Sequence, residues 1–155
     1  MVALIVTVTV GLDQLTKWWA ESALADGDTV GVLPTLEFDL TYNSGFSFSA
    51  GSGNGSWIGL LVAILVAFLI WQISKSIDTG RAIILTVILG GAIGNLIDRI
   101  FRADDGVLSG EVIDFIDVSW YAVFNVADIF VVCGSIGFVI YELRVARSEK
   151  ETITS

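Results

Sequence analysis

The chain contains no histidine and a single cysteine, Cys133. Histidine is the general base of Ser–His–Asp hydrolases and a common zinc ligand, so its absence excludes such triads and most zinc sites. One cysteine excludes an internal disulfide and a cysteine-rich metal site. Because Cys133 lies in an apolar run, we expect a small buried hydrophobic side chain there. Any chemistry must therefore use carboxylates, amides, hydroxyls or the few lysines and arginines.

Charged residues are also scarce. They make up 16% of the 155 residues, and apolar residues make up 54%, whereas soluble domains have about 25% and about 45–50%. The mean hydropathy is +0.79. The length fits one domain covering residues 1–155, and the composition indicates an integral membrane protein. The net charge of −9 argues against a nucleic-acid partner.

Long apolar segments suggest the membrane topology, because a transmembrane helix needs about 20 mostly apolar residues. We predict four such helices, at about residues 1–19, 57–73, 82–100 and 121–143. The first segment lacks the basic start and small-residue exit of a removable signal peptide. Segments 20–56 and 101–120 are predicted to lie outside the membrane, with short strands at 36–40 and 112–118 and glycine-rich loops. We expect the polar tail from Arg144 to be frayed.

The basic residues predict the orientation. Five of the eight lie in the loop between the second and third segments or in the tail, namely Lys75, Arg81, Arg144, Arg147 and Lys150. Cytoplasmic loops carry an excess of lysine and arginine, so both termini are predicted to be cytoplasmic. Segments 20–56 and 101–120 then face outward.

Acidic and amide residues lie inside or beside the apolar segments, and all fall near the predicted outer ends. They are Asp13, Asn43, Asn95, Asp98, Asp114, Asn125 and Asp128. A carboxylate at the centre of a membrane helix costs about 2.5–3.5 kcal/mol, so such residues face a protein interior or a wet cavity. Their common depth predicts one polar site near the outer interface.

Two groups that contain these residues also have ordinary interpretations. Gly91, Asn95 and Asp98 share one helical stripe by their i, i+4, i+7 spacing, which also suits a packing face. Asn125 could simply cap the N-terminus of a helix, and the negative charge of Asp128 would be stabilised by the positive end of the helix dipole there.

The remaining polar residues have ordinary interpretations too. Asp114 could face solvent, as most charged residues do. Asp13 and Lys17 could be an interfacial i, i+4 pair, worth only about 0.3–0.5 kcal/mol.

Asp114 and Asp128 support a sharper hypothesis. Two carboxylates from different elements can converge on one water, and like charges that close titrate as a unit. One then accepts a proton from water while the other polarises a peptide carbonyl, as in aspartic proteases. This chemistry needs no histidine.

Five motifs in this order resemble the lipoprotein signal peptidase family, also called signal peptidase II. They are DQLTK at Asp13, YNSGFSF at Tyr42, GGAIGNLIDR at Gly90, VIDF at Val112 and FNVAD at Phe124. The resemblance implies an aspartyl intramembrane peptidase of the bacterial cytoplasmic (inner) membrane. Its expected fold is α-helical, with four transmembrane helices and a small extracytoplasmic β-cradle.

The resemblance also implies an activity and a set of site residues. The family removes signal peptides from prolipoproteins just before a diacylglyceryl-modified cysteine. By motif position, Asp114 and Asp128 would be the catalytic pair. The expected supporting or substrate-binding residues are Asp13, Lys17, Asn43, Gly91, Asn95, Asp98, Arg99 and Asn125. We expect a monomer whose partners are the lipid-modified prolipoprotein and membrane lipids, with no metal and no organic cofactor.

Several alternatives remain open at the level of sequence. Arg99 could pair with Asp98 or stabilise the site from behind. The loop Tyr42–Phe48 is expected to clamp over substrate. Intramembrane acids also build proton relays, so a small ion-coupled carrier is a rival function, and a structural scaffold is a third.

Overall fold

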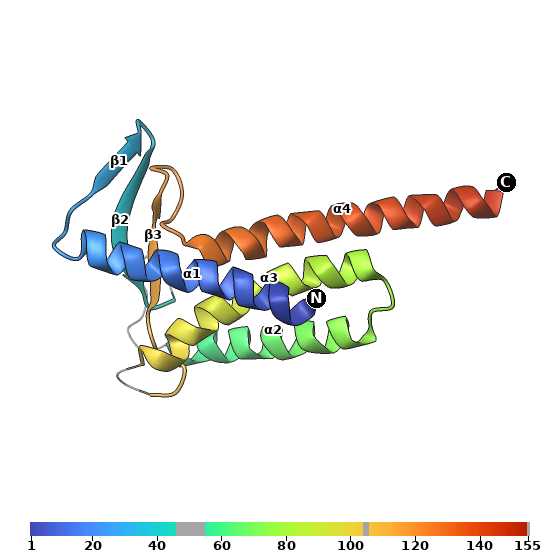
Figure 1. The fold of residues 1–155 in the computed structure, drawn as a ribbon, viewed down its shortest axis with the longest axis horizontal. Helices are drawn as coiled ribbons and strands as arrows, with labels where there is room; N and C mark the ends of the chain where they lie inside the picture. Colours follow the sequence, from blue (N-terminus) through green and yellow to red (C-terminus); the bar gives the residue numbers. More distant parts are fainter. Residues whose placement is uncertain (46–54, 104–105, 155) are drawn as a thin grey trace.

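The computed structural model describes residues 1–45, 55–103 and 106–154. The chain forms four helices and three strands, in the order α1 (Val2–Leu24), β1 (Val30–Leu33), β2 (Leu36–Asn43), α2 (Gly55–Lys75), α3 (Thr79–Phe101), β3 (Val112–Asp117) and α4 (Val126–Thr154). The helices lie side by side, and the sheet lies at one end of the bundle (Figure 1). Both termini point toward the other end.

The third helix is the centre of the bundle. In the most apolar 18-residue stretch of α3, 50% is buried inside the protein, whereas only 11% of the corresponding stretch is buried in α2 and in α4. Glycines allow its neighbours to approach closely. A Cβ at Gly94 would overlap the Asp13 carboxylate of α1, and one at Gly91 would lie 2.5 Å from the Ala127 carbonyl oxygen of α4. The glycine stripe of α3 is therefore a packing face as well as part of the site.

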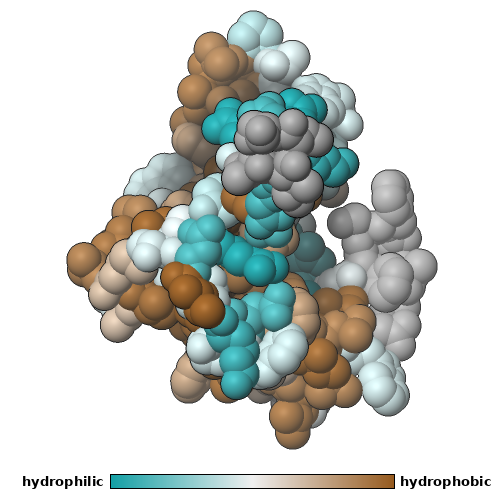
Figure 2. All heavy atoms as spheres, turned by 90° about the vertical axis from the view of Figure 1, so that its right-hand side faces the viewer, coloured by the Kyte–Doolittle hydropathy of each residue, from teal (hydrophilic) through white to brown (hydrophobic). Residues whose placement is uncertain are grey.

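In the part of the chain that the structure describes, three helices are long and apolar enough to cross a membrane: Ser56–Lys75, Thr79–Phe101 and Val126–Glu151. Their exposed faces are hydrophobic. From the end away from the sheet, hydrophilic residues gather in the middle of the molecule and hydrophobic residues surround them (Figure 2). This distribution suits a bundle that is enclosed by lipid.

The first helix has a different pattern. Among the described helices, α1 is not apolar enough over its length to count as a candidate membrane span. Its buried stripe is partly polar and consists of Thr9, Asp13, Lys17, Ala20 and Leu24. Its exposed positions include Leu4, Leu12, Leu15 and Trp18. The polar residues of α1 thus face the other helices, while its apolar residues face outward.

The sheet has the order β1-β2-β3, and both pairings are antiparallel. Thr41 pairs with Asp114, and Phe115 of β3 packs with Ala20 and Leu24 of α1 in a small core. An isolated bridge between Ile116 and Phe124 carries the chain from β3 to the start of α4. The sheet therefore fixes β3 against the ends of α1 and α4.

Several predicted boundaries were wrong. The fourth helix was expected at 121–143 but begins at Val126, because Phe124 pairs with β3. The tail after Arg144 was expected to be frayed, yet α4 continues to Thr154, because this tail is rich in good helix formers. The first helix continues past residue 19 to Leu24.

Two further expectations need comment. Cys133 was expected to be buried, but it is exposed, because it lies on an outward face of α4. Strand β1 was not predicted, since its short segment carries little alternation. The proposed clamp Tyr42–Phe48 extends beyond Gly45, and its residues 46–48 lie outside the described part of the chain.

Candidate active site

Two aspartates meet where the sheet joins the bundle. Asp114 comes from β3 and Asp128 from the first turn of α4. All four of their carboxylate oxygens accept hydrogen bonds from N–H groups. Asp114 accepts from Asn125 Nδ2 at 2.6 Å and from Asn43 Nδ2 at 2.7 Å. Asp128 accepts from Asn95 Nδ2 at 2.8 Å and from the Asn125 backbone N–H at 3.1 Å.

Asn125 and Asp128 form a reciprocal cap at the start of α4. Asn125 Oδ1 accepts from the backbone N–H of Asp128 at 3.0 Å, while the Asp128 carboxylate accepts from the backbone N–H of Asn125. This is the capping-box pattern of helix N-termini. Because the backbone occupies Asn125 Oδ1, its amino group must point the other way, toward Asp114. The interpretation of this motif as a helix cap is therefore confirmed, and the same cap directs Asn125 toward Asp114.

Asn43 is oriented in a similar way. Its Oδ1 accepts from the backbone N–H of Gly45 at 2.8 Å, which leaves its amino group for Asp114. Gly45 has a φ of +112°, and a Cβ there would overlap the Ile58 side chain. Only glycine fits this turn without strain. The YNSG sequence thus aims Asn43 at Asp114.

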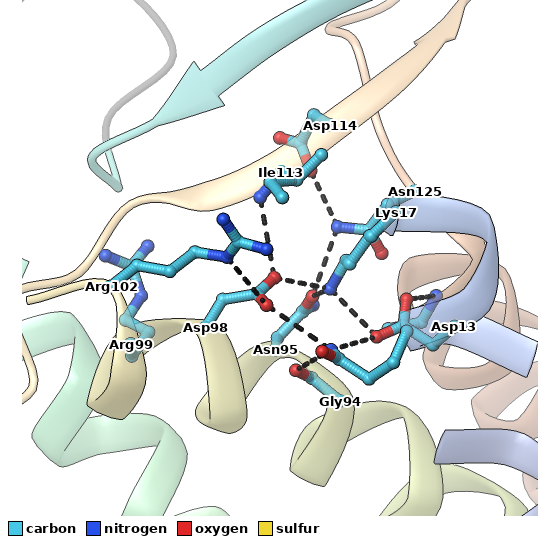
Figure 3. Close-up of polar contacts among 12 residues, drawn as sticks. Asp13, Lys17, Gly94, Asn95, Asp98, Arg99, Arg102, Ile113, Asp114 and Asn125 are labelled. Atoms are coloured by element: carbon cyan, nitrogen blue, oxygen red, sulfur yellow. Dashed lines mark hydrogen bonds and ion pairs between the residues drawn. The ribbon is translucent and has the colours of Figure 1, made fainter. Parts of the chain in front are cut away.

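A buried ion cluster lies below Asp114 in the view of Figure 3. Lys17 Nζ contacts Asp98 Oδ2 at 2.7 Å, Asp13 Oδ2 at 2.9 Å and Asn95 Oδ1 at 2.9 Å. Asp13 Oδ1 accepts from the Ala127 backbone N–H at 3.0 Å, near the start of α4. Lys17 and Asp13 are 0% exposed and Asp98 is 1% exposed. The interpretation of Asp13–Lys17 as an interfacial pair was wrong, because α3 and α4 cover it.

The two arginines after Asp98 have different roles. Arg99 Nη1 donates to the carbonyl oxygens of Gly110 at 3.0 Å and Ser44 at 3.3 Å, and so joins the loops that precede β3 and follow β2. Arg102 contacts Asp98 Oδ1 at 3.4 Å and forms a two-pronged pair with Glu21 at 2.7 and 3.0 Å. Of the two roles left open for Arg99, the stabilising one fits the structure.

The two aspartates open onto one pocket of about 630 Å³. Its walls are mainly apolar, from residues 118 to 124 and from the first two turns of α4, with Asn43 beside the acids. The pKa of Asp114 is raised to about 6, mainly by burial and also by the negative charge of Asp128. Hydrogen bonds from Asn43 and Asn125 and the charge of Lys17 act in the opposite direction. A carboxyl that titrates near neutral pH is suited to proton transfer.

The structure adds residues that the sequence did not single out. Gln14 Nε2 donates to Asp13 Oδ2, Gly94 O and Asp98 Oδ1 at 3.1 to 3.3 Å, and Arg102 and Glu21 cover the cluster from outside. The i, i+4 spacing of Asp98 and Arg102 is a feature of the sequence that could have indicated that Arg102 joins the cluster. Among the described residues, no three histidine, cysteine, aspartate or glutamate side chains are grouped as a metal site would require.

Comparisons with known proteins point to one family. Residues 5–144 match the family model described as signal peptidase (SPase) II. The chain is 39% identical to the lipoprotein signal peptidase of Bifidobacterium adolescentis, over 89% of this chain and 73% of that protein. It is 40% identical to the lipoprotein signal peptidase of Mycobacterium tuberculosis strain H37Rv, over 92% of this chain and 71% of that protein.

A solved structure supports the fold. A bacterial membrane enzyme determined by the in meso method at 2.3 Å resolution is similar, with a TM-score of 0.78 and 28% identity. The match covers 97% of this chain and 92% of that one. The chain thus belongs to the signal peptidase II family, the aspartic peptidases that process lipoproteins.

Proposed function

We propose that this chain is the aspartic endopeptidase that removes the signal peptide from diacylglyceryl-modified prolipoproteins. It cleaves just before the lipidated cysteine, with Asp114 and Asp128 as the catalytic pair. One observation carries the assignment of the pair: two acids from different elements, with all four oxygens held by N–H donors, line the same apolar pocket.

The mechanism follows from a pair that shares one proton. The ionised carboxylate accepts a proton from water, and the water oxygen attacks the scissile carbonyl carbon. The protonated carboxyl donates its proton to the carbonyl oxygen, which gives a neutral tetrahedral diol. Collapse of the diol breaks the C–N bond: the carboxyl that took the water proton gives it to the leaving nitrogen, and one diol hydroxyl returns its proton to the other carboxylate, which restores the pair. The raised pKa of Asp114 favours a cycle that starts with the shared proton on Asp114.

The surrounding groups fix this geometry. Asn43, Asn95 and Asn125 donate to the carboxylates and so limit their rotation. Positioning of this kind matters because small displacements of reacting groups cost large factors in rate. The apolar walls of the pocket suit the signal peptide and acyl chains of the substrate.

The membrane arrangement belongs to the same proposal. We infer that α1 is a fourth transmembrane helix, since its outward residues are apolar and its polar residues contact α3. Both termini then lie in the cytoplasm and the aspartates lie near the outer face. A monomer in contact with membrane lipids holds the complete set of acids and amides.

The test is cleavage of a diacylglyceryl-modified prolipoprotein by the purified chain, followed by gel mobility. Asp114→Asn and Asp128→Asn are each expected to abolish cleavage while retaining the fold. Asp28→Asn, at an exposed position, is the matched control and is expected to cleave like the parent. Cleavage by either active-site variant at the parental rate would refute the pair. Proton-coupled transport in liposomes without peptide cleavage would favour the carrier.

A further inference from the structure

We infer that Lys17 is a positioning residue for the catalytic pair, because its buried ammonium fixes the orientation of the Asn95 carboxamide that holds Asp128. The inference rests on the proposed function and deepens it. In this role Lys17 does not contact the substrate, and its ion pairs do more than hold the helices together.

The argument starts from how each amide is oriented. A carboxamide can rotate by 180° and exchange its acceptor for its donors. For Asn43 and Asn125 a backbone N–H settles the choice, because it binds the side-chain oxygen. Asn95 lies inside α3 and takes both hydrogen bonds to Oδ1 from side chains, namely Lys17 Nζ at 2.9 Å and Asn125 Nδ2 at 3.1 Å.

Lys17 is suited to this task because an ammonium can only donate. It therefore requires the oxygen of Asn95 to face it, and the amino group of Asn95 must then face Asp128 Oδ1, which it reaches at 2.8 Å. Hydrogen bonds with an ionised partner are roughly twice as strong as neutral ones. Reversal of the carboxamide would place its amino group against the ammonium, and Asp128 would lose a donor.

The other contacts of Lys17 exclude a direct role in the reaction. Asp13, Asp98 and Asn95 together occupy its three N–H donors. The side chain is 0% exposed. Within the described residues, Lys17 is absent from the pocket wall, which is formed by Asn43, Asp114 and eleven of the residues between Val118 and Cys133. Lys17 thus acts on the reaction through Asn95 and through its charge.

Its charge gives a second effect that can be measured. Charged groups on three neighbouring elements lie near Asp114: Lys17 and Asp13 on α1, Asp98 and Arg99 on α3, and Asp128 on α4, while β2 contributes the neutral Asn43. The charge of Lys17 favours ionised Asp114. Its loss therefore moves the pH dependence of cleavage upward, whereas a lost structural contact alone would lower the rate at every pH.

The experiment measures kcat and KM over a range of pH for Lys17→Met, with a diacylglyceryl-modified peptide as substrate. We expect kcat to fall roughly 10–100-fold, KM to change little, and the pH profile to move to higher pH. Lys75→Met changes an exposed lysine at the end of α2 and is the matched control. Its kcat, KM and pH profile are expected to equal those of the parent.

Lys17→Met leaves Asp13 without its cation and leaves Asp98 with Arg102 alone, so its folding is at risk. The second variant is Lys17→Met with Asp98→Asn, which removes one buried charge of each sign. If Lys17 only holds the helices together, this balanced variant recovers cleavage along with its thermal stability. Under our inference it regains stability, but its kcat stays at least about tenfold low, since Asn95 still lacks the ammonium.

The outcomes distinguish the positioning role of Lys17 from the assignment of the chain as a peptidase. Recovery of kcat in the balanced variant, or an unshifted profile in a folded Lys17→Met, overturns the positioning role and leaves the peptidase assignment in place. Failure of the folded parent to cleave, or full cleavage by Asp114→Asn, overturns both.

Discussion

The burial of Asp114 predicts that the protein loses stability as the pH rises from about 4 to about 7. Asp114 is 2% exposed, and its pKa is raised from 3.8 to about 6. A group whose pKa is higher in the folded state binds its proton more tightly there. Its contribution to stability is therefore complete below pH 3.8 and is lost as the pH rises through about 6.

The size of this effect follows from the difference between the two pKa values. Each pKa unit corresponds to about 1.36 kcal/mol, so the rise from 3.8 to about 6 gives about 3 kcal/mol in the free energy of unfolding. Asp114→Asn should remove this pH-dependent part. The variant also loses an acceptor for Asn43 or Asn125, which costs about 1–3 kcal/mol but does so at every pH. The slope with pH, and not the absolute stability, is therefore the quantity to compare.

The assay is unfolding in mixed detergent micelles between pH 4 and pH 8, for the parent and Asp114→Asn. The difference between the two free energies of unfolding should change by about 2 kcal/mol across this range, because more than half of the unfolded Asp114 carboxyl is already ionised at pH 4. Asp28→Asn, at an exposed position, is the control and should keep the parental pH dependence. A parental slope in Asp114→Asn would refute the reasoning, since it would mean that Asp114 is not the buried group that titrates.

Three further predictions concern activity and packing. Asn43→Ala removes one donor from Asp114 and should lower kcat roughly tenfold, measured by peptide cleavage, and it should also cost about 1–3 kcal/mol in unfolding, because a buried carboxylate oxygen loses its partner. The kcat/KM of the free enzyme should fall as the pH rises through about 6, because the pair needs one proton; an alkaline limb far from that pH in a steady-state profile would contradict this. Gly94→Ala places a methyl group against the Asp13 carboxylate and should cost about 1–3 kcal/mol in unfolding, whereas Gly137→Ala, with open space around it, should not.

The sequence predicted the helical membrane class because long apolar runs and scarce charges are properties of composition. It also placed the acids at one depth, since each lies near the end of an apolar run. Asp114 and Asp128 could be paired by chemistry and by resemblance to the family. The local pattern around Asp128 was equally compatible with a helix cap, and the pattern around Asp114 with a solvent-facing acid. In the structure Asn125 is both a cap and a donor to Asp114, so the two interpretations were never exclusive.

Contacts between distant segments were beyond the reach of local patterns. Asp13 and Lys17 looked like an exposed i, i+4 pair, but residues about 80 positions away cover them and give Lys17 two more partners. The start of α4 shifted to Val126 because the bridge between Ile116 and Phe124 competes with helix formation. Such pairings depend on which elements are neighbours in space, and the periodicity of a single segment does not encode that.

The amino-acid sequence by itself determined the chemical inventory: carboxylates and amides without histidine, set in helices that favour lipid. Side-chain chemistry and hydropathy belong to each residue alone, so they can be read without a fold. The tertiary structure decided which oxygen faces which nitrogen, how deeply Asp114 is buried, and that Lys17 lies behind the pair. Burial, and the direction in which an amide points, arise only when α1, α3, β3 and α4 pack together.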